Sequence, residues 1–297
     1  MIDSRIGCST ISFRHLDLHT ALDTIAHLGF TEVDLGSLPG VCTHVPTSLT
    51  ASDVPAVVAA VAESGLAVRS INCDVGDLND PRVDVASSVH LARLIDLAAE
   101  LGAGALVLPN GAIAHRPIDT LEVDLDRVAA NLSIASERSA RLGVATWTES
   151  LHVYRLCCNL ERAQALTSRL DPSIGIVMDF SHIVASGADP VDFVDVFSGR
   201  VTHVHVRDAT AGSVDLDGAV VTDEAGNINL SVGRGDVDFK SGIDALHASG
   251  YTGHYTLELE TRDVTDAERP TATAAAAQSI TALLGQSTSN NHKETNR

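Results

Sequence analysis

The feature of this sequence that most constrains its fold is a recurring phrase: a helix-like stretch, a glycine, and a short apolar run. It appears as "IAHLGFTEVDLG", "VAESGLAVRSIN", "AAELGAGALVLP", "SARLGVATWTES", "DVFSGRVTHVHV" and "LHASGYTGHYTLEL". A glycine just past a helix adopts the left-handed conformation that other residues resist. A short run rich in Val, Ile, Leu and Thr is typical of a strand buried on both faces. Each repeat therefore predicts a helix followed by a buried parallel strand.

The spacing of these glycines predicts eight strands. Gly29, Gly65, Gly102 and Gly143 are 36, 37 and 41 residues apart, which is about one strand–helix unit. The 56 residues from Gly143 to Gly199 leave room for one more unit, whose strand is "SIGIVMDFSH". With the N-terminal "IGCSTISF", the expected strands span 6–13, 31–37, 66–74, 105–111, 144–150, 174–182, 201–208 and 255–260. This alternation predicts an α/β fold, a single closed (β/α)8 TIM barrel.

The barrel is expected to occupy residues 1–284, with its clearest helices at 82–101 and at 119–142, where Asp119 is the expected N-cap. Residues 209–237 form a long loop that suggests a hairpin over the barrel mouth. Residues 285–297, "GQSTSNNHKETNR", are polar and predict a disordered tail. The competing fold is a doubly wound open sheet, which would need a Gly-rich phosphate loop after the first strand. "STISFRHLDL" contains none.

Charge and cysteine content limit the partners of the chain. Its 39 acidic and 20 basic residues give a net charge of −19, which repels a phosphate backbone and argues against nucleic acid as a partner. Five cysteines without a CxxC pair indicate reduced thiols and a cytoplasmic protein. The N-terminal segment "MIDSRIGCSTISF" predicts no signal peptide, and no run of 18 apolar residues predicts a membrane span.

Ionisable residues gather at the ends of four consecutive expected strands, where the chemistry of a barrel of this kind lies. They are Glu149; Asp179 and His182; His203, His205, Arg207 and Asp208; and Glu258 and Glu260. A single glutamate at a strand end is usually a solvated rim residue or a partner of the next helix. Adjacent strands lie about 4.8 Å apart, so groups from four neighbouring strands can converge on one ion. Three carboxylates and one imidazole predict a hard divalent cation, such as Mn²⁺, Mg²⁺ or Co²⁺, at a shared site.

Two choices within this set depend on side-chain direction. His203 and His205 alternate along their strand and point to the same face. His205 is nearer the C-terminal end and is the better ligand, whereas His203 is expected to be a deeper, hydrogen-bonded residue. Periodicity alone leaves open whether Glu258 or Glu260 joins the site.

Over residues 5–284 the sequence resembles the xylose isomerase-like barrel superfamily, which includes ketose 3-epimerases, hydroxypyruvate isomerase and inosose dehydratase. The resemblance is carried by "TES", "MDFSH", "HVHVRD", "GRGDVDF" and "GYTGHYTLELE". It implies metal ligands at Glu149, Asp179, His205 and Glu258. The family's last glutamate follows a glycine by five residues, so Gly253 selects Glu258.

The same resemblance implies His182 and Arg207 as substrate contacts, and Glu149 and Glu258 as catalytic proton carriers. Related barrels are often dimers or tetramers, so a homo-oligomer or a partner subunit is also an expectation. Mn²⁺ is the expected ion, with Mg²⁺, Co²⁺ or Zn²⁺ as alternatives.

Other residues of the expected loops are weaker candidates for substrate contact. His152 lies three residues after Glu149, and His44 lies in the Pro/Gly-bounded loop "LPGVCTHVP". A surface position for His152 and a packing role for His44 are the alternatives. Asn72, Asp74 and Asp77 follow the third strand, where turn formation and helix capping are the more common roles.

These residues favour a metal-dependent sugar isomerase or epimerase acting on a small ketose, polyol or keto-acid. Removing a proton beside a ketone creates an enediolate, which a divalent ion stabilises as a Lewis acid while two carboxylates move protons. The alternative is a dehydratase or lyase acting on an inosose or a 3-keto sugar or glycoside through the same site. An abasic-site endonuclease is disfavoured, because "TDEAGNINLSVGRGD" lacks the histidine of that class and the charge opposes DNA. A non-catalytic sugar-binding barrel would not need four intact ligand positions.

Overall fold

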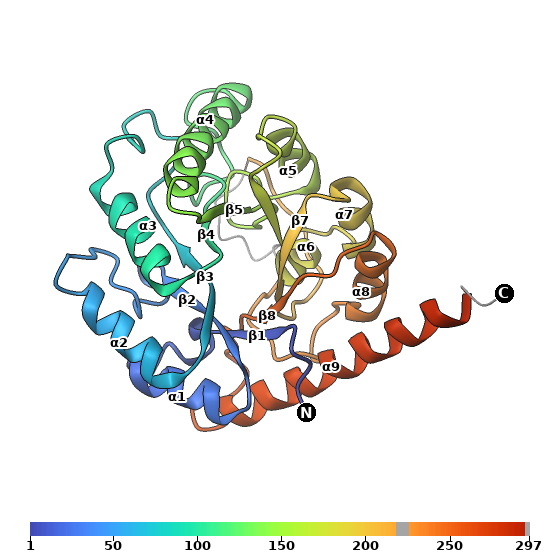
Figure 1. Cartoon of the computed structure of the whole chain (residues 1–297). Helices are drawn as coiled ribbons and strands as arrows, with labels where there is room; N and C mark the ends of the chain where they lie inside the picture. Colours follow the sequence, from blue (N-terminus) through green and yellow to red (C-terminus); the bar gives the residue numbers. More distant parts are fainter. Residues whose placement is uncertain (218–225, 295–297) are drawn as a thin grey trace.

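Eight parallel strands close into a ring in sequence order, which confirms the predicted (β/α)8 barrel and excludes the open sheet (Figure 1). The computed structural model describes residues 1–217 and 226–294. The strands are β1 (Ile6–Ser9), β2 (Glu32–Ser37), β3 (Ala67–Cys73), β4 (Ala105–Leu108), β5 (Ala145–Glu149), β6 (Gly175–Asp179), β7 (Val201–Val206) and β8 (Tyr255–Leu257). The ring closes where β8 pairs with β1, with Cys8 opposite Leu257.

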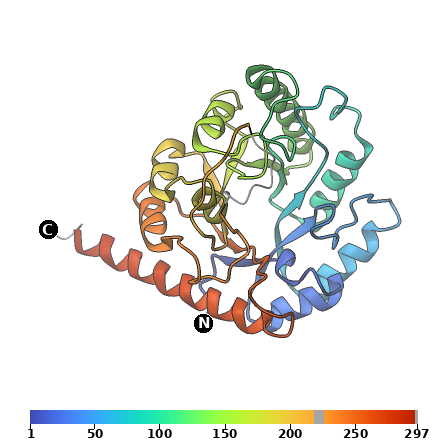
Figure 2. The same ribbon diagram turned by 180° about the vertical axis from the view of Figure 1, so that it is seen from behind.

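The longer helices surround the strand ring on its outside, as Figure 2 shows from behind. The helices are the 3₁₀ helix η1 (Thr10–Phe13) and the α-helices α1 (Leu18–His27), α2 (Val54–Ser64), α3 (Val89–Leu101), α4 (Leu121–Ala140), α5 (Leu160–Thr167), α6 (Phe180–Ala185), α7 (Pro190–Phe197), α8 (Phe239–Ala248) and α9 (Arg269–Glu294). The short α6 lies close to the ring beside β7 (Figure 1). Gly65 and Gly102 end α2 and α3 in the left-handed conformation, which confirms the role assigned to the recurring glycine.

Several predicted boundaries are wrong, because polar side chains cap helices earlier or later than periodicity suggests. β6 ends at Asp179, whose carboxylate accepts from the backbone amides of Ser181 and His182 and so begins α6. The strand predicted at 174–182 is therefore too long, and His182 lies on a helix. Likewise, α3 begins only after the N-cap Ser88, and Thr120 replaces the expected Asp119 as the N-cap of α4.

The C-terminal segment differs from the expected disordered tail. Helix α9 continues to Glu294, and Figure 1 shows its last turns extending beyond the barrel. Its first part is anchored by the buried residues Ala277, Ile280 and Leu284. Once a packed, Ala-rich segment has nucleated a helix, each further residue adds a hydrogen bond, so polar residues can continue it. Residues 295–297 of that predicted tail lie outside the described residues.

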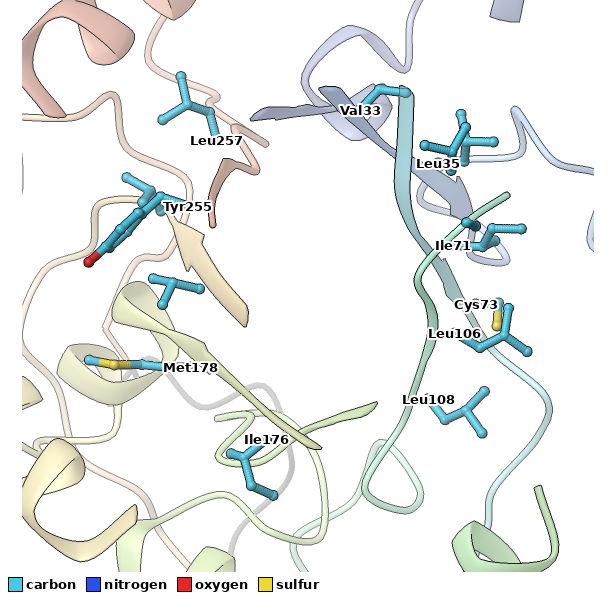
Figure 3. Packing of buried hydrophobic residues seen from close by; sticks show 14 of the residues in the cluster. Val33, Leu35, Ile71, Cys73, Leu106, Leu108, Ile176, Met178, Tyr255 and Leu257 are labelled. Atoms are coloured by element: carbon cyan, nitrogen blue, oxygen red, sulfur yellow. The ribbon is translucent and has the colours of Figure 1, made fainter. Parts of the chain in front are cut away.

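Alternate residues of each strand face the helices and form the main apolar core. Figure 3 shows Leu35, Ile71, Leu106 and Met178 pointing outward from the ring, and all four are buried. Successive side chains of a strand point to opposite faces, so the intervening residues face the interior of the barrel. That interior set includes Asp34, Glu149, Asp179, His203 and His205, and the barrel therefore encloses polar groups at its C-terminal end.

All five cysteines are buried and carry free thiols. Within residues 1–217 and 226–294, none of the helices combines the length and the apolar character that crossing a bilayer requires.

Candidate active site

The structure brings together the four residues for which the sequence predicts metal binding. One ligand atom from each of Glu149, Asp179, His205 and Glu258 lies within 4.8 Å of the others, and all four residues are buried. Glu149 and Asp179 end β5 and β6, and Glu258 directly follows β8. Asp179 and His205 are register partners on neighbouring strands, which sets them at the same height in the barrel. The open choice between Glu258 and Glu260 is also decided geometrically, because Glu258 lies in this cluster.

The electrostatics of the cluster fit a divalent cation. Burial above all raises the pKa of Glu149 to about 7, and the negative charges of Asp179 and Glu258 add to this effect. Burial opposes protonation of His205, but Glu258 and Glu149 outweigh it and raise its pKa well above the usual value. Carboxylates crowded away from water need a compensating positive charge. Three oxygen donors and one imidazole are a donor set that suits a hard or borderline divalent ion.

Arg207 fixes the other side of the cluster and is itself buried. Its guanidinium donates to Asp179 Oδ2 and Glu260 Oε1, each at 3.0 Å, and its Nε donates to Ser181 Oγ at 3.0 Å. Burial opposes the charge of Arg207, but these carboxylates and Glu258 outweigh it and raise its pKa. Glu260 thus pairs with Arg207 and helps to hold it in place. Glu260 therefore lies beside the metal-ligand cluster and not within it.

Two closely packed, tilted imidazoles border the cluster. The rings of His152 and His182 lie 3.8 Å apart between centroids, and His152 Nε2 lies 3.9 Å from Glu149 Oε2. His182 Nε2 lies 3.1 Å from Arg207 Nη2 and must accept there, because a guanidinium only donates. Burial, together with nearby positive charge, lowers the pKa of both histidines well below the usual value. The structure therefore places two neutral imidazoles where the sequence predicts substrate contacts.

The fourth predicted substrate contact, His44, is not brought to this site. Its Nε2 lies 2.9 Å from the carbonyl oxygen of Leu16, and its Nδ1 lies 3.3 Å from Cys42 Sγ. Both ring nitrogens thus have partners, one in the segment between η1 and α1 and one in the loop after β2, and His44 is absent from the described residues that line the pocket. These contacts fit the alternative packing role better than the predicted contact with substrate.

Asp34 on β2 is a functional candidate that the sequence reasoning missed. Its Oδ2 accepts from His203 Nε2 at 2.7 Å and lies 3.8 Å from His205 Nε2, behind the cluster. Burial opposes its ionisation, but His203 and His205 outweigh burial and lower the pKa of Asp34 to about 2. This confirms His203 as a deeper, hydrogen-bonded residue. The signal was present: an aspartate in the middle of the apolar strand "TEVDLG" must have a buried partner.

The residues at the C-terminal end of β3 also contribute more than turns and caps. Asn72 Nδ2 donates to Glu258 Oε1 at 3.1 Å, and Asp74 Oδ2 accepts from Arg155 Nη2 at 2.9 Å. Asn72, Asp74 and Arg155 all line the pocket. Arg155 could not be assigned from its sequence position, because its contact with Asp74 joins residues 81 positions apart.

Above the cluster lies a cavity of about 480 Å³, with Glu149, His182, Arg207 and Glu258 among its lining residues. The long loop between β7 and α8 supplies Ile228 and Asn229 to its wall. This agrees with a loop over the barrel mouth, although residues 218–225 of the predicted hairpin lie outside the described residues. A small polyhydroxylated molecule in this cavity would meet carboxylates, a guanidinium and neutral imidazoles.

Asp208 anchors that loop, and its removal is expected to destabilise the protein more than removal of a helix cap. Asp208 Oδ2 accepts from the amides of Gly233, Arg234 and Gly235 at 2.7 to 3.1 Å. Asp208→Ala leaves these donors unpaired and is expected to lower the free energy of unfolding by about 2–3 kcal/mol. Asp238→Ala removes the N-cap of α8 and should cost about 1 kcal/mol. Urea denaturation of both variants tests the order; equal losses would contradict the anchoring role.

Comparison with known proteins yields partial sequence matches and full-length structural matches. Rhizopine catabolism protein MocC of Rhizobium meliloti is 29% identical over 137 residues, 43% of this chain and 41% of that protein. Inosose dehydratase of Geobacillus thermodenitrificans is 30% identical over 106 residues, 34% of this chain and 35% of the enzyme. The chain thus matches well under half the length of these curated relatives.

The solved structures agree in fold at low identity. D-psicose 3-epimerase of Clostridium cellulolyticum H10 has TM-score 0.74 and 13% identity over 94% of this chain and 99% of its own. The IolI protein with a bound zinc atom has TM-score 0.74 and 14% identity over 95% of this chain and 98% of its own. 3-Keto-D-glucoside 4-epimerase of E. coli has TM-score 0.70 and 20% identity over 92% of this chain and 99% of its own.

The sequence model of one family spans most of the barrel. It matches residues 22–283, from the first helix to the last, and therefore includes all four residues of the buried cluster. The chain belongs to the family of xylose isomerase-like TIM barrels.

Proposed function

We propose that the protein is a divalent-metal-dependent isomerase or epimerase that acts on a small ketose, polyol or keto-acid through an enediolate. The observation that carries this proposal is the buried set of Glu149, Asp179, His205 and Glu258, of which Glu149 and Glu258 line the cavity. These residues would hold the ion, for which Mn²⁺ is our first choice and Mg²⁺, Co²⁺ and Zn²⁺ are alternatives. When bound, the ion would supply Lewis-acid stabilisation of negative charge on the substrate oxygens.

The two glutamates are suited to different parts of a proton transfer. The pKa of Glu149 is raised to about 7, mainly by burial. Burial acts in the same direction on Glu258, but His205 and Arg207 outweigh it and lower the pKa of Glu258. Two carboxyl groups with pKa values pushed apart are typical of an acid and a base that work together. We assign proton removal and proton return to this pair, and substrate orientation to Arg207, His182 and His152.

A dehydratase is the second candidate, because several curated sequence matches are inosose dehydratases at 27 to 30% identity. Such an enzyme would use the same proton removal and then expel a hydroxyl group from the neighbouring carbon. A lyase acting on a 3-keto sugar or glycoside would differ only in the leaving group.

Proton exchange in D₂O separates these candidates. The metal-loaded protein is incubated with candidate ketoses and with inososes, and the products are followed by NMR. Deuterium incorporation next to the carbonyl with formation of an isomer supports the isomerase or epimerase. Appearance of an unsaturated product supports the dehydratase. If the metal-loaded protein produces neither exchange nor elimination with any of them, the enzymatic proposal fails.

Metal binding is expected to stabilise the fold in a way that depends on Glu258 and not on Glu260. At a hundredfold excess over Kd, an ion that binds only the folded state adds about 2.7 kcal/mol, or roughly 4 °C in Tm for a chain of this length. This metal-dependent rise in Tm should be larger at about pH 8 than at about pH 6, because the ligands must lose protons to bind the ion. Glu258→Gln should abolish most of this rise, whereas Glu260→Gln should retain it. Thermal denaturation with Mn²⁺ and with EDTA is the measurement, and equal effects in both variants would contradict the assigned ligand set.

A further inference from the structure

The cavity above the cluster has an ionic half and an apolar half. The ionic half belongs to β5, β6, β7 and β8, which carry Glu149, Asp179, His205 and Glu258. In a ring closed in sequence order, β1 to β4 occupy the opposite half. The lining residues that belong to β1, β2 and β4 or directly follow them include Ile11, Leu38, Val41, Val107, Leu108 and Ile113. The substrate pocket is therefore divided between two opposite sides of the barrel.

The polar side chains on the apolar half are already engaged. They come from β3 and the residue after it, where Asn72 donates to Glu258 and Asp74 pairs with Arg155. These contacts hold both side chains toward Glu258 and Arg155, away from the apolar residues that follow β2 and β4. A sugar hydroxyl pressed against Leu38, Val41 or Ile113 would lose its hydrogen bonds to water without replacement. This side of the cavity is thus poorly suited to a second polyhydroxylated unit.

The apolar half is also left open in the free protein. Ile113 is 61% exposed although it lines the cavity, and Leu38 and Val41 are only partly buried. A cavity of about 480 Å³ falls within the roughly 300–1,000 Å³ of pockets that enclose drug-sized ligands. A free ketose is smaller than such a ligand and would leave this wall in contact with water.

We propose that the substrate is amphipathic: a keto-sugar or polyol head at the ionic half, joined to an apolar group that packs on Leu38, Val41 and Ile113. This inference rests on the proposed function and names its substrate class, which is a sugar derivative with an apolar substituent, for example an alkyl or aryl glycoside. Burial of the apolar group supplies affinity at the wall, while the cluster and Arg207 orient the reacting head.

Calorimetric titration of the Mn²⁺-loaded protein with two glucosides tests the apolar wall. Phenyl β-D-glucopyranoside and methyl β-D-glucopyranoside share the sugar and differ in the apolar group, and neither contains a ketone that could react. The phenyl compound is expected to bind at least about tenfold more tightly. Ile113→Ser should reduce that preference by about threefold. Ile118→Ser is the matched control, because Ile118 lies in the same loop and is 50% exposed but is not among the lining residues.

Equal affinities for the two glucosides, or no binding of either, would overturn the inference. So would an unchanged preference in Ile113→Ser, or an equal loss in Ile118→Ser. Failure of the proposed function gives a different pattern. In that case the phenyl preference and its dependence on Ile113 persist, but no ketose or inosose undergoes proton exchange or elimination.

Discussion

Glu149→Gln is expected to lower turnover by about a thousandfold or more while leaving the barrel folded. Glu149 is assigned two roles, as a ligand of the ion and as a carrier of the substrate proton. At neutral pH an amide is only an uncharged, weaker ligand, and it cannot take up and release the proton. The fold should tolerate the change, since burial already raises the pKa of Glu149 to about 7. Near that pH much of the metal-free protein therefore carries the neutral acid, which glutamine closely resembles in shape.

Three measurements make this prediction specific. Proton exchange in D₂O reports turnover, metal analysis reports ion binding, and circular dichroism with thermal denaturation reports folding. Glu137→Gln is the control, because Glu137 is an exposed glutamate on α4, and its turnover should match that of the wild type. Retention of turnover within tenfold in Glu149→Gln would remove this residue from the reaction.

The barrel could be predicted from sequence because its signals are local and repeated. A glycine that ends a helix and the apolar run that follows it can be recognised within about ten residues. The repetition of this pattern then predicts the order of strands and helices. The ends of the elements could not be fixed in this way. The carboxylate of Asp179 ends a strand and caps a helix at the same time, so an apolar run through "MDFSH" gave a strand that was too long.

The residues of the candidate site also fall into two groups: those that local sequence patterns predict and those that depend on tertiary packing. Glu149, Asp179, His205 and either Glu258 or Glu260 stand at consecutive strand ends, so the fold prediction brings these positions together, and the family resemblance then selects Glu258. Asp34 and Arg155 act through partners 169 and 81 residues away, and their side-chain directions depend on packing that no local pattern records. His44 is not brought to the pocket for the related reason that position in a loop does not determine the direction of a side chain. Its nitrogens contact Leu16 and Cys42 within the N-terminal part of the chain.

Arg207→Met is expected to be the most destabilising substitution in the site. Methionine fills much of the space of the arginine side chain but leaves Asp179, Glu258 and Glu260 without the guanidinium that pairs with all three. Removing one partner from a buried ionic network costs about 3–5 kcal/mol. Arg169→Met is the matched control, since Arg169 also pairs with two carboxylates, Glu122 and Asp126, but both are strongly exposed. That variant should lose less than about 1 kcal/mol.

The pH and metal dependence of this loss identify its cause. Arg207 and His205 outweigh burial and hold the pKa of Asp179 below its usual 3.8, so the stabilisation is present above that pH and is lost as the pH falls. Urea denaturation should therefore show the full deficit of Arg207→Met at neutral pH and a smaller one in acid. Excess Mn²⁺ should also recover part of it, because the ion replaces the missing positive charge. If the loss of stability is instead the same at every pH, and the same with and without Mn²⁺, its cause is lost packing. The carboxylates would then not depend on Arg207 for a compensating positive charge.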